Sequence, residues 1–129
     1  MLRVRVMRPS LEALGRFDAA RAKARFLATF SQQETQIIVQ DGTIAGFFVL
    51  RERFDHLYLD HLYIDTDFQR RGLGRFAVQW TQSLAAAKSV PVRLIALVQS
   101  PANAFYQSCG FVEIGRDGVD ITYEWSSAR

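Results

Sequence analysis

One segment constrains this chain more than any other: the run of Gln69, Arg70, Arg71, Gly72, Leu73 and Gly74. A strand-like run, residues 57–64, precedes it and a helix-like run, residues 75–87, follows it. Glycine lacks a Cβ, so main-chain N–H groups can converge on an anion, and the unpaired N–H groups at the start of the helix point to the same place. Arg70, Arg71 and Arg75 add positive charge. The pattern predicts a phosphate-binding turn, although glycines of this kind also serve ordinary strand-to-helix turns.

The length and composition predict one compact domain over residues 1–129, because 49% of the residues are hydrophobic and 22% are charged. No apolar run approaches the roughly 20 residues of a membrane span, and the first residues alternate charged with apolar side chains, unlike a signal peptide. We therefore expect a cytoplasmic protein with no membrane partner. The single cysteine, Cys109, excludes an internal disulfide framework and a cysteine-rich zinc site, and we expect no metal.

Basic residues are concentrated in residues 1–30, where they are scattered over probable helices. A nucleic-acid surface would need them on one face with groove-reading elements beside them. A solvated helix face is therefore the favoured interpretation, an anion-attracting rim is the alternative, and no nucleic-acid partner is expected.

The apolar periodicity predicts the order of the elements. Alternation predicts a strand over residues 2–6, helical spacing covers residues 10–30, and a hairpin joins residues 36–40 to 43–50 through Asp41 and Gly42. The central strand, residues 57–64, is apolar on both faces and should be covered on both.

The second half of the chain continues this pattern. A long helix should bury Leu73, Ala77, Trp80, Leu84 and Ala87 and end before Pro91. A strand over residues 92–98, a helix from Ser100 to Cys109, and strands over residues 111–114 and 119–125 follow.

This order predicts an α/β (α+β) sandwich: a mixed, mostly antiparallel sheet of six or seven strands with about four flanking helices. One right-handed parallel crossover should run through residues 57–98. Ligands of such sheets bind beyond the carboxyl ends of the parallel strands, where the arginine–glycine turn lies.

The chain also resembles the GNAT superfamily of acetyl-CoA dependent N-acetyltransferases, and the likeness covers residues 2–125. It depends on the element order and on two motifs: Leu62, Tyr63 and Ile64 followed by residues 69–74, and residues 102–106 followed by Cys109, Gly110 and Phe111. The resemblance implies acetyl-CoA as co-substrate. It also implies that main-chain amides from Arg70 to Arg75 hold the pyrophosphate, and that main-chain groups of Leu62 and Ile64 pair with the pantetheine arm.

The resemblance further implies that Tyr106 is the general acid that protonates the departing thiolate; packing in the core is the alternative. The base should lie on the strand face shared with Leu62 and Ile64, which alternation gives to Asp60 and Tyr58 and denies to His61. Asp60, acting through water, is the first choice. A carboxylate in so apolar a run could instead be structural, satisfied by backbone donors.

One departure from the family pattern affects the pantetheine contact, because Gln99 stands near the position of the usual asparagine and Asn103 lies on the helix instead. Either amide could be an ordinary cap. We expect an N-acetyltransferase that acts by direct transfer on a primary amine of a small molecule or peptide, as a monomer or homodimer. A non-catalytic acyl-CoA binding module is the alternative. An anionic acceptor, drawn by Arg16, Arg21 or Arg25, is a weaker hypothesis.

Overall fold

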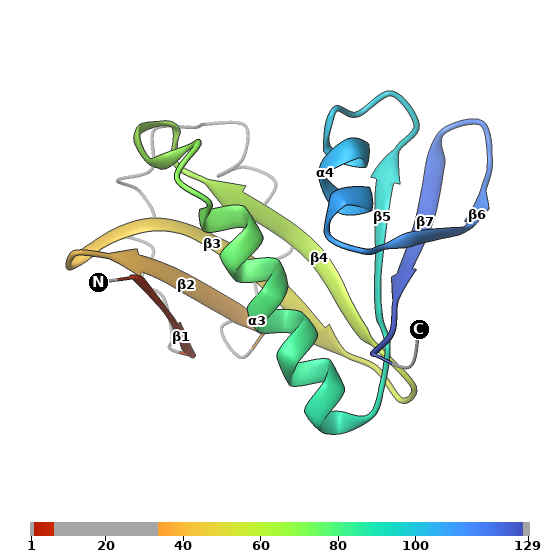
Figure 1. Ribbon diagram of the computed structural model, residues 1–129, viewed down its shortest axis with the longest axis horizontal. Coiled ribbons are helices and arrows are strands. Elements are labelled where there is room, and N and C mark those ends of the chain that lie inside the picture. Colours follow the sequence, from red (N-terminus) through yellow and green to blue (C-terminus); the bar gives the residue numbers. More distant parts are fainter. Residues whose placement is uncertain (1, 7–33, 128–129) are drawn as a thin grey trace. The chain divides into compact units, whose positions relative to one another are not determined.

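The computed structural model describes residues 2–6 and 34–127. Its elements are β1 (Leu2–Val6), β2 (Thr35–Gln40), β3 (Thr43–Glu52), β4 (Leu57–Ile64), the 3₁₀ helix η1 (Thr66–Phe68), α3 (Leu73–Lys88), β5 (Val92–Leu97), α4 (Ala102–Ser108), β6 (Val112–Arg116) and β7 (Asp120–Trp125), as Figure 1 shows. The helices expected between residues 10 and 30 lie outside the described residues, as do Arg16, Arg21 and Arg25.

The strands form one seven-stranded sheet in the order β1-β2-β3-β4-β5-β7-β6. β4 and β5 are parallel, with Leu57 opposite Val92 and Tyr58 opposite Arg93, and α3 lies between them in the sequence. The mixed sheet, the single crossover and the place of β4 in the middle of the strand order confirm the predicted fold class. The short η1 helix was not predicted, because three residues carry no periodic signal.

The chain divides into two compact units, the first of which comprises Met1–Leu50 and His61–Ala77. Within it β1 pairs with β2 and β2 with β3, all antiparallel. Asp41 (φ 52°) and Gly42 (φ 79°) both adopt left-handed backbone in the hairpin turn, as the sequence predicted. One hydrophobic cluster of this unit is made by alternate residues of the hairpin: Ile37, Val39, Phe47 and Val49.

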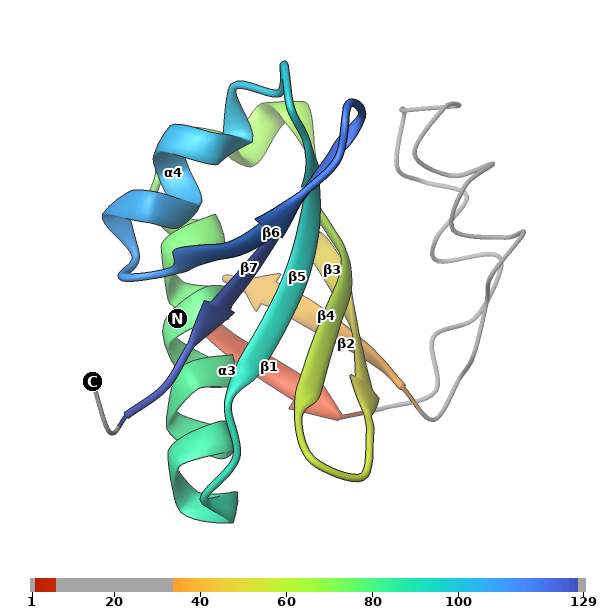
Figure 2. The same cartoon turned by 90° about the vertical axis from the view of Figure 1, so that its right-hand side faces the viewer.

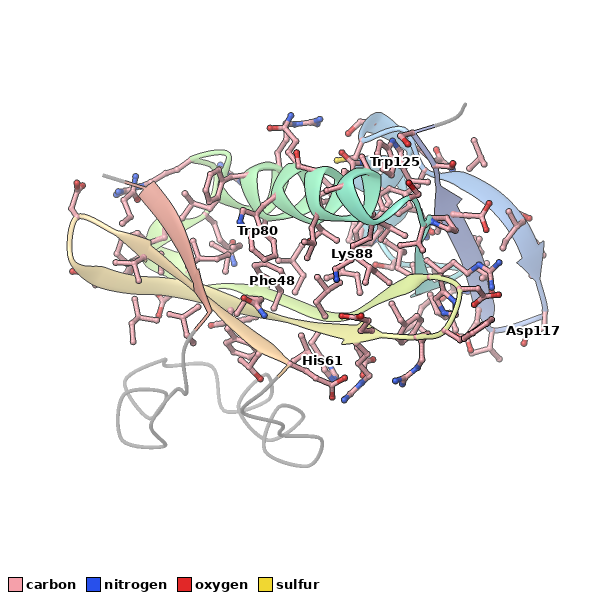
Figure 3. All side chains as sticks on the ribbon, turned by 90° about the horizontal axis from the view of Figure 1, so that it is seen from below. Phe48, His61, Trp80, Lys88, Asp117 and Trp125 are labelled. Carbon is pink, nitrogen blue, oxygen red and sulfur yellow. The ribbon has the colours of Figure 1, made fainter. Side chains whose placement is uncertain are left out.

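The second unit comprises Arg51–Asp60 and Val78–Arg129. Here β7 pairs with β5 on one side and β6 on the other, and α4 packs beside these strands (Figure 2). Val92, Leu94 and Ala96 alternate inward from β5. The predicted turn at Asp117 and Gly118 joins β6 to β7 (Figure 3), and Asp117 Oδ1 accepts hydrogen bonds from the amides of Val119 (2.7 Å) and Asp120 (2.8 Å).

Two expectations about burial were wrong. Ala87 is exposed, because it lies about 200° around α3 from the buried Ala85. The buried stripe of α3 is Leu73, Ala77, Val78, Thr81 and Ala85. In β4 only Leu57 and Leu59 are buried. The strands covered on both faces are instead β2, whose residues 35–39 are all buried, and β3, whose residues 45–50 are all buried. The apolar run of β3 is less interrupted than that of β4.

No helix in the described ranges is both long and apolar enough to span a bilayer. Within the same ranges, no group of three or more His, Cys, Asp or Glu side chains is arranged to hold a metal ion.

Candidate active site

The turn that follows β4 is built by short-range hydrogen bonds of the first unit. Asp65 caps η1, since its Oδ1 accepts from the amide of Asp67 at 3.1 Å. Gln69 Nε2 donates to the carbonyl oxygen of Ile64 at 3.1 Å and so ties the turn to the end of β4. That carbonyl is one of the groups expected to pair with pantetheine, and it already has a partner.

The predicted phosphate turn has left-handed backbone at two positions, Arg70 (φ 65°) and Gly72 (φ 79°). Glycine adopts this region at no steric cost, whereas arginine rarely does. The turn is thus a specific conformation and not an extended connection, and Gly72 is needed for it.

The start of α3 leaves main-chain donors without helical acceptors. The amide of Phe76 donates to the carbonyl of Gly72 at 2.9 Å, and the amides of Leu73 and Gly74 before it have no acceptor within the helix. The first turn of α3 contains no acidic residue. The N-terminus of this 16-residue helix therefore favours binding of an anion, because it offers main-chain N–H donors and carries no negative charge.

The arginines of this turn differ in the contacts that their side chains make. Arg71 is held by neutral groups, because its Nη1 donates to Gln40 Oε1 at 3.3 Å and its Cζ lies 5.2 Å from the centre of the Phe68 ring. Arg70 is exposed. Neither of these two contacts of Arg71 is with a charged group, so positive charge remains beside the amides of Leu73 and Gly74.

The last residues of β4 lie very close to β3. A Cβ added to Gly46 would collide with the carbonyl oxygen of Tyr63 and touch the main chain of Ile64 at 3.2 Å. The Tyr63 ring packs on Phe47, with 5.6 Å between ring centroids. Gly46 thus permits the backbone of β3 to approach the segment of Leu62, Tyr63 and Ile64, where the pantetheine arm was expected.

Tyr106 lies on α4, in the second unit. Its ring packs on three others, Phe105 at 5.3 Å, Phe111 at 5.9 Å and Tyr123 at 6.4 Å between centroids. Its hydroxyl has no hydrogen-bond partner among the described residues. Among those residues, Gln36 Oε1 is the one side-chain atom that is both buried and without a partner, so the Tyr106 hydroxyl is accessible to solvent. Burial, and to a lesser degree the Cys109 thiol, raises the pKa of Tyr106 above its ordinary value. The side chain is therefore a protonated phenol with an accessible hydroxyl.

Asn103 has a structural role in the same unit. Its Nδ2 donates to the carbonyls of Leu97 (2.8 Å), Val98 (3.2 Å) and Ser100 (2.8 Å), and its Oδ1 accepts from the Tyr123 hydroxyl at 2.8 Å. These bonds favour the alternative interpretation, an amide that organises the chain, over a pantetheine contact. Gln99 is exposed.

The candidate bases differ in what surrounds them. The Asp60 carboxylate is paired with Arg51, with 2.7 Å between Oδ2 and Nε, and both side chains are largely buried. This ion pair stabilises the carboxylate in the apolar strand. Burial, followed by the nearby carboxylates of Asp60 and Asp120, raises the pKa of Tyr58, so its phenol keeps its proton at neutral pH.

A family model described as an acetyltransferase (GNAT) domain matches residues 8–123 of the chain. The chain belongs to the GNAT acetyltransferase family. No curated protein is similar enough in sequence to count as a relative.

Solved structures show the same GNAT fold at low sequence identity. The PaiA N-acetyltransferase of Thermoplasma acidophilum, crystallised with coenzyme A, is 18% identical with a TM-score of 0.76, covering 98% of this chain and 99% of that one. The ribosomal-protein-S18-alanine N-acetyltransferase of Escherichia coli is 19% identical with a TM-score of 0.72, covering 96% and 91%. A protein of Bacillus anthracis, crystallised in complex with acetyl coenzyme A, is 22% identical with a TM-score of 0.64, covering 71% and 61%.

In this GNAT domain the predicted site residues fall into two groups. Leu62, Tyr63, Ile64 and residues 69–75 belong to the first unit, whereas Tyr58, Asp60, Asn103 and Tyr106 belong to the second. Sequence reasoning missed Gly46, Arg51 and Tyr123. An isolated glycine in a strand pattern signals close backbone approach and could have indicated Gly46. No local signal could have paired Arg51 with Asp60 or Tyr123 with Asn103, because both contacts are tertiary.

Proposed function

We propose that this GNAT domain transfers the acetyl group of acetyl-CoA to a primary amine of a small molecule or peptide, by direct transfer in a ternary complex. Membership of the family supports acyl transfer. One observation carries the proposal for this chain: the amides of Leu73 and Gly74 lack helical acceptors in a turn that holds Arg70 and Arg71 and no acid.

In the proposed complex, main-chain amides from Arg70 to Arg75 hold the pyrophosphate, and the guanidinium groups add charge-assisted hydrogen bonds. Main-chain groups of Leu62 to Ile64 pair with the pantetheine arm as an added strand. The carbonyl of Ile64 already accepts a hydrogen bond from Gln69 Nε2, so one lone pair of its oxygen is left for this pairing. Two of the three solved structures named above contain coenzyme A or acetyl coenzyme A, which supports this ligand class.

The proposed chemistry moves one acetyl group and three protons. The neutral amine attacks the thioester carbonyl carbon, the nitrogen of the tetrahedral intermediate loses one proton to solvent, and the intermediate collapses to the amide as the C–S bond breaks. The thiolate takes the proton of the Tyr106 hydroxyl, and solvent returns a proton to the phenolate. The free, protonated hydroxyl of Tyr106 supports this role, since a phenol that is bound elsewhere would have to break that bond first.

The third proton leaves the ammonium form of the amine before the attack. We assign it to Asp60, acting through an ordered water, because the raised pKa of Tyr58 leaves almost no phenolate at neutral pH. The largely buried Arg51 guanidinium holds the Asp60 carboxylate in one orientation.

Two measurements test the proposal. Calorimetry of the full chain with coenzyme A at low ionic strength should give heat, and acetyl-CoA should bind with similar affinity. A panel of primary amines, scored by thiol release from acetyl-CoA, should then contain acceptors, and ranking cationic, neutral and anionic amines would define the acceptor class. Absence of heat in the first experiment would contradict the proposed ligand and with it the function.

The ion pair between Arg51 and Asp60 favours a second candidate, a non-catalytic module that binds acyl-CoA, because a carboxylate held by arginine can be purely structural. Such a module needs the phosphate turn but neither Asp60 nor Tyr106. Binding of coenzyme A without thiol release across a broad amine panel would support the module over the enzyme.

A further inference from the structure

We propose that Tyr123, acting through Asn103 and Gln107, is a positioning residue that fixes the Tyr106 phenol for proton transfer. The inference rests on the proposed acid role of Tyr106 and adds to it the means by which that side chain is held in place.

The Tyr123 hydroxyl makes two hydrogen bonds, both with side chains of α4. Tyr123 comes from β7, is 0% exposed, and donates to Asn103 Oδ1 at 2.8 Å. The same hydroxyl accepts a hydrogen bond from Gln107 Nε2 at 3.3 Å. Asn103 and Gln107 are one helical turn apart and have Tyr106 between them in the sequence. One phenol of the sheet therefore holds both ends of the turn that carries Tyr106.

The Asn103 amide extends this attachment to a second strand. Its Nδ2 donates to the carbonyl of Leu97, the last residue of β5, and to that of Ser100, both at 2.8 Å. Since a primary amide has two N–H donors and these are taken up by main-chain carbonyls, Asn103 has none left for a ligand. It therefore serves as a connector from β5 and β7 to the first turn of α4.

Tyr106 needs such a framework, because it has no polar anchor of its own. Its hydroxyl has no partner in the described part of the chain, so a hydrogen bond from that hydroxyl cannot set its position. Its position depends on its backbone, whose carbonyl accepts from the amides of Cys109 (3.0 Å) and Phe111 (3.2 Å), and on the ring contact with Tyr123 at 6.4 Å. Since the proposed proton donor has no hydrogen bond of its own, its neighbours have to orient it.

A merely structural Tyr123 would stabilise the fold without affecting the Tyr106 phenol, and NMR can separate the two roles. The chain has four tyrosines, so ¹³Cζ labelling of all tyrosines in the full chain gives four signals, which single Tyr→Phe variants assign. Coenzyme A is the probe. In the wild type its addition should shift the Tyr106 signal, because the thiol reaches the hydroxyl.

Tyr123→Phe keeps the ring and removes the hydroxyl. We expect it to bind coenzyme A with less than a threefold change in affinity, yet to lose at least half of the shift of the Tyr106 signal. Thr81→Val is the matched control, because Thr81 on α3 is also 0% exposed and the change replaces its hydroxyl by a methyl group. The Tyr106 shift in this variant should equal that of the wild type. If Tyr123→Phe does not fold, Gln107→Ala, at an exposed position, breaks one of the two bonds and should lose part of the shift.

A wild-type shift of Tyr106 in Tyr123→Phe, or the same loss in Thr81→Val, would overturn the positioning role. Failure of the proposed function gives a different result, since the wild type would then show no heat with coenzyme A, or would bind it with no shift of Tyr106.

Discussion

Tyr106 and Tyr123 pack ring on ring, with 6.4 Å between centroids, but only Tyr123 has its hydroxyl in a hydrogen-bond network. Tyr123 is completely buried, and its hydroxyl joins β7 to α4. The Tyr106 hydroxyl has no partner in the described part of the chain. Two phenols in contact thus differ in kind: one organises the fold, and the other is available to a ligand.

Replacing Tyr106 by phenylalanine should lower kcat by about 100-fold or more, because the thiolate would leave without a proton donor. The ring contacts remain, so the KM for acetyl-CoA and the affinity for coenzyme A should change little. Steady-state kinetics with an acceptor from the amine panel, together with calorimetry, would measure both. An unchanged kcat would show that Tyr106 is not the general acid and only packs in the core.

Alkaline pH should destabilise the protein in a manner that depends on Tyr106. The pKa of Tyr106 is raised in the folded state, so as the pH passes about 10 the unfolded chain loses its phenolic protons first and the free energy of unfolding falls. This decline ends only above the raised pKa. Tyr58 contributes in the same direction. Urea unfolding at about pH 9 and about pH 11 should show a smaller loss in Tyr106→Phe than in the wild type, and equal losses would contradict the assignment.

Arg70→Asn tests the phosphate turn without changing its backbone, because asparagine tolerates the left-handed conformation that Arg70 adopts. Coenzyme A should bind about fivefold more weakly, as expected for loss of an exposed charge, and less so at high salt. Two controls are available. Arg53→Gln removes an exposed charge elsewhere and should have no effect. S-acetyl-pantetheine, which lacks the pyrophosphate, should bind both proteins equally; a loss of that ligand too would contradict the role.

Asp60→Asn should lower kcat by about 10-fold or more if the carboxylate serves as the base. Arg51→Gln breaks the same ion pair but keeps the carboxylate, so it is the matched control for stability. The predicted outcome is a comparable fall in Tm for both variants and a much larger fall in kcat for Asp60→Asn. Equal effects of the two variants on kcat would make Asp60 structural.

Gly46→Ala should destabilise the protein by about 1 to 3 kcal/mol, because the new methyl group meets the carbonyl of Tyr63 and β3 must move away from β4. Gly115→Ala on β6 is the control, since nothing lies within 4 Å of its added Cβ. Urea unfolding gives the difference in stability. If the segment of Leu62 to Ile64 binds pantetheine, Gly46→Ala should also weaken binding of S-acetyl-pantetheine, whereas Gly115→Ala should not.

The bounds of β1 and β4 agree with the sequence prediction at both ends, and those of β2, β3, β5 and β7 within two residues, because each is a short apolar run closed by turn residues. Gly72 could also be predicted, since a strand-to-helix turn with left-handed backbone favours glycine. Asn103 shows the limit of this approach. Its residue type and position suit a ligand contact, and only the coordinates show that β5 carbonyls and Tyr123 use its polar atoms.

The sequence by itself determined the order of the elements, the family and the composition of the phosphate turn, because these depend on periodicity and on residues close together in the chain. The tertiary structure decided which residues contact one another across the fold. Arg51 pairs with Asp60, Tyr123 bonds to Asn103, and Gly46 contacts Tyr63. The partners in each pair are too far apart in the sequence for a local sequence pattern to predict the contact. The physical reason is that apolar spacing reports which face of an element is buried, whereas the use of each buried polar atom depends on which distant group folding brings within hydrogen-bond distance.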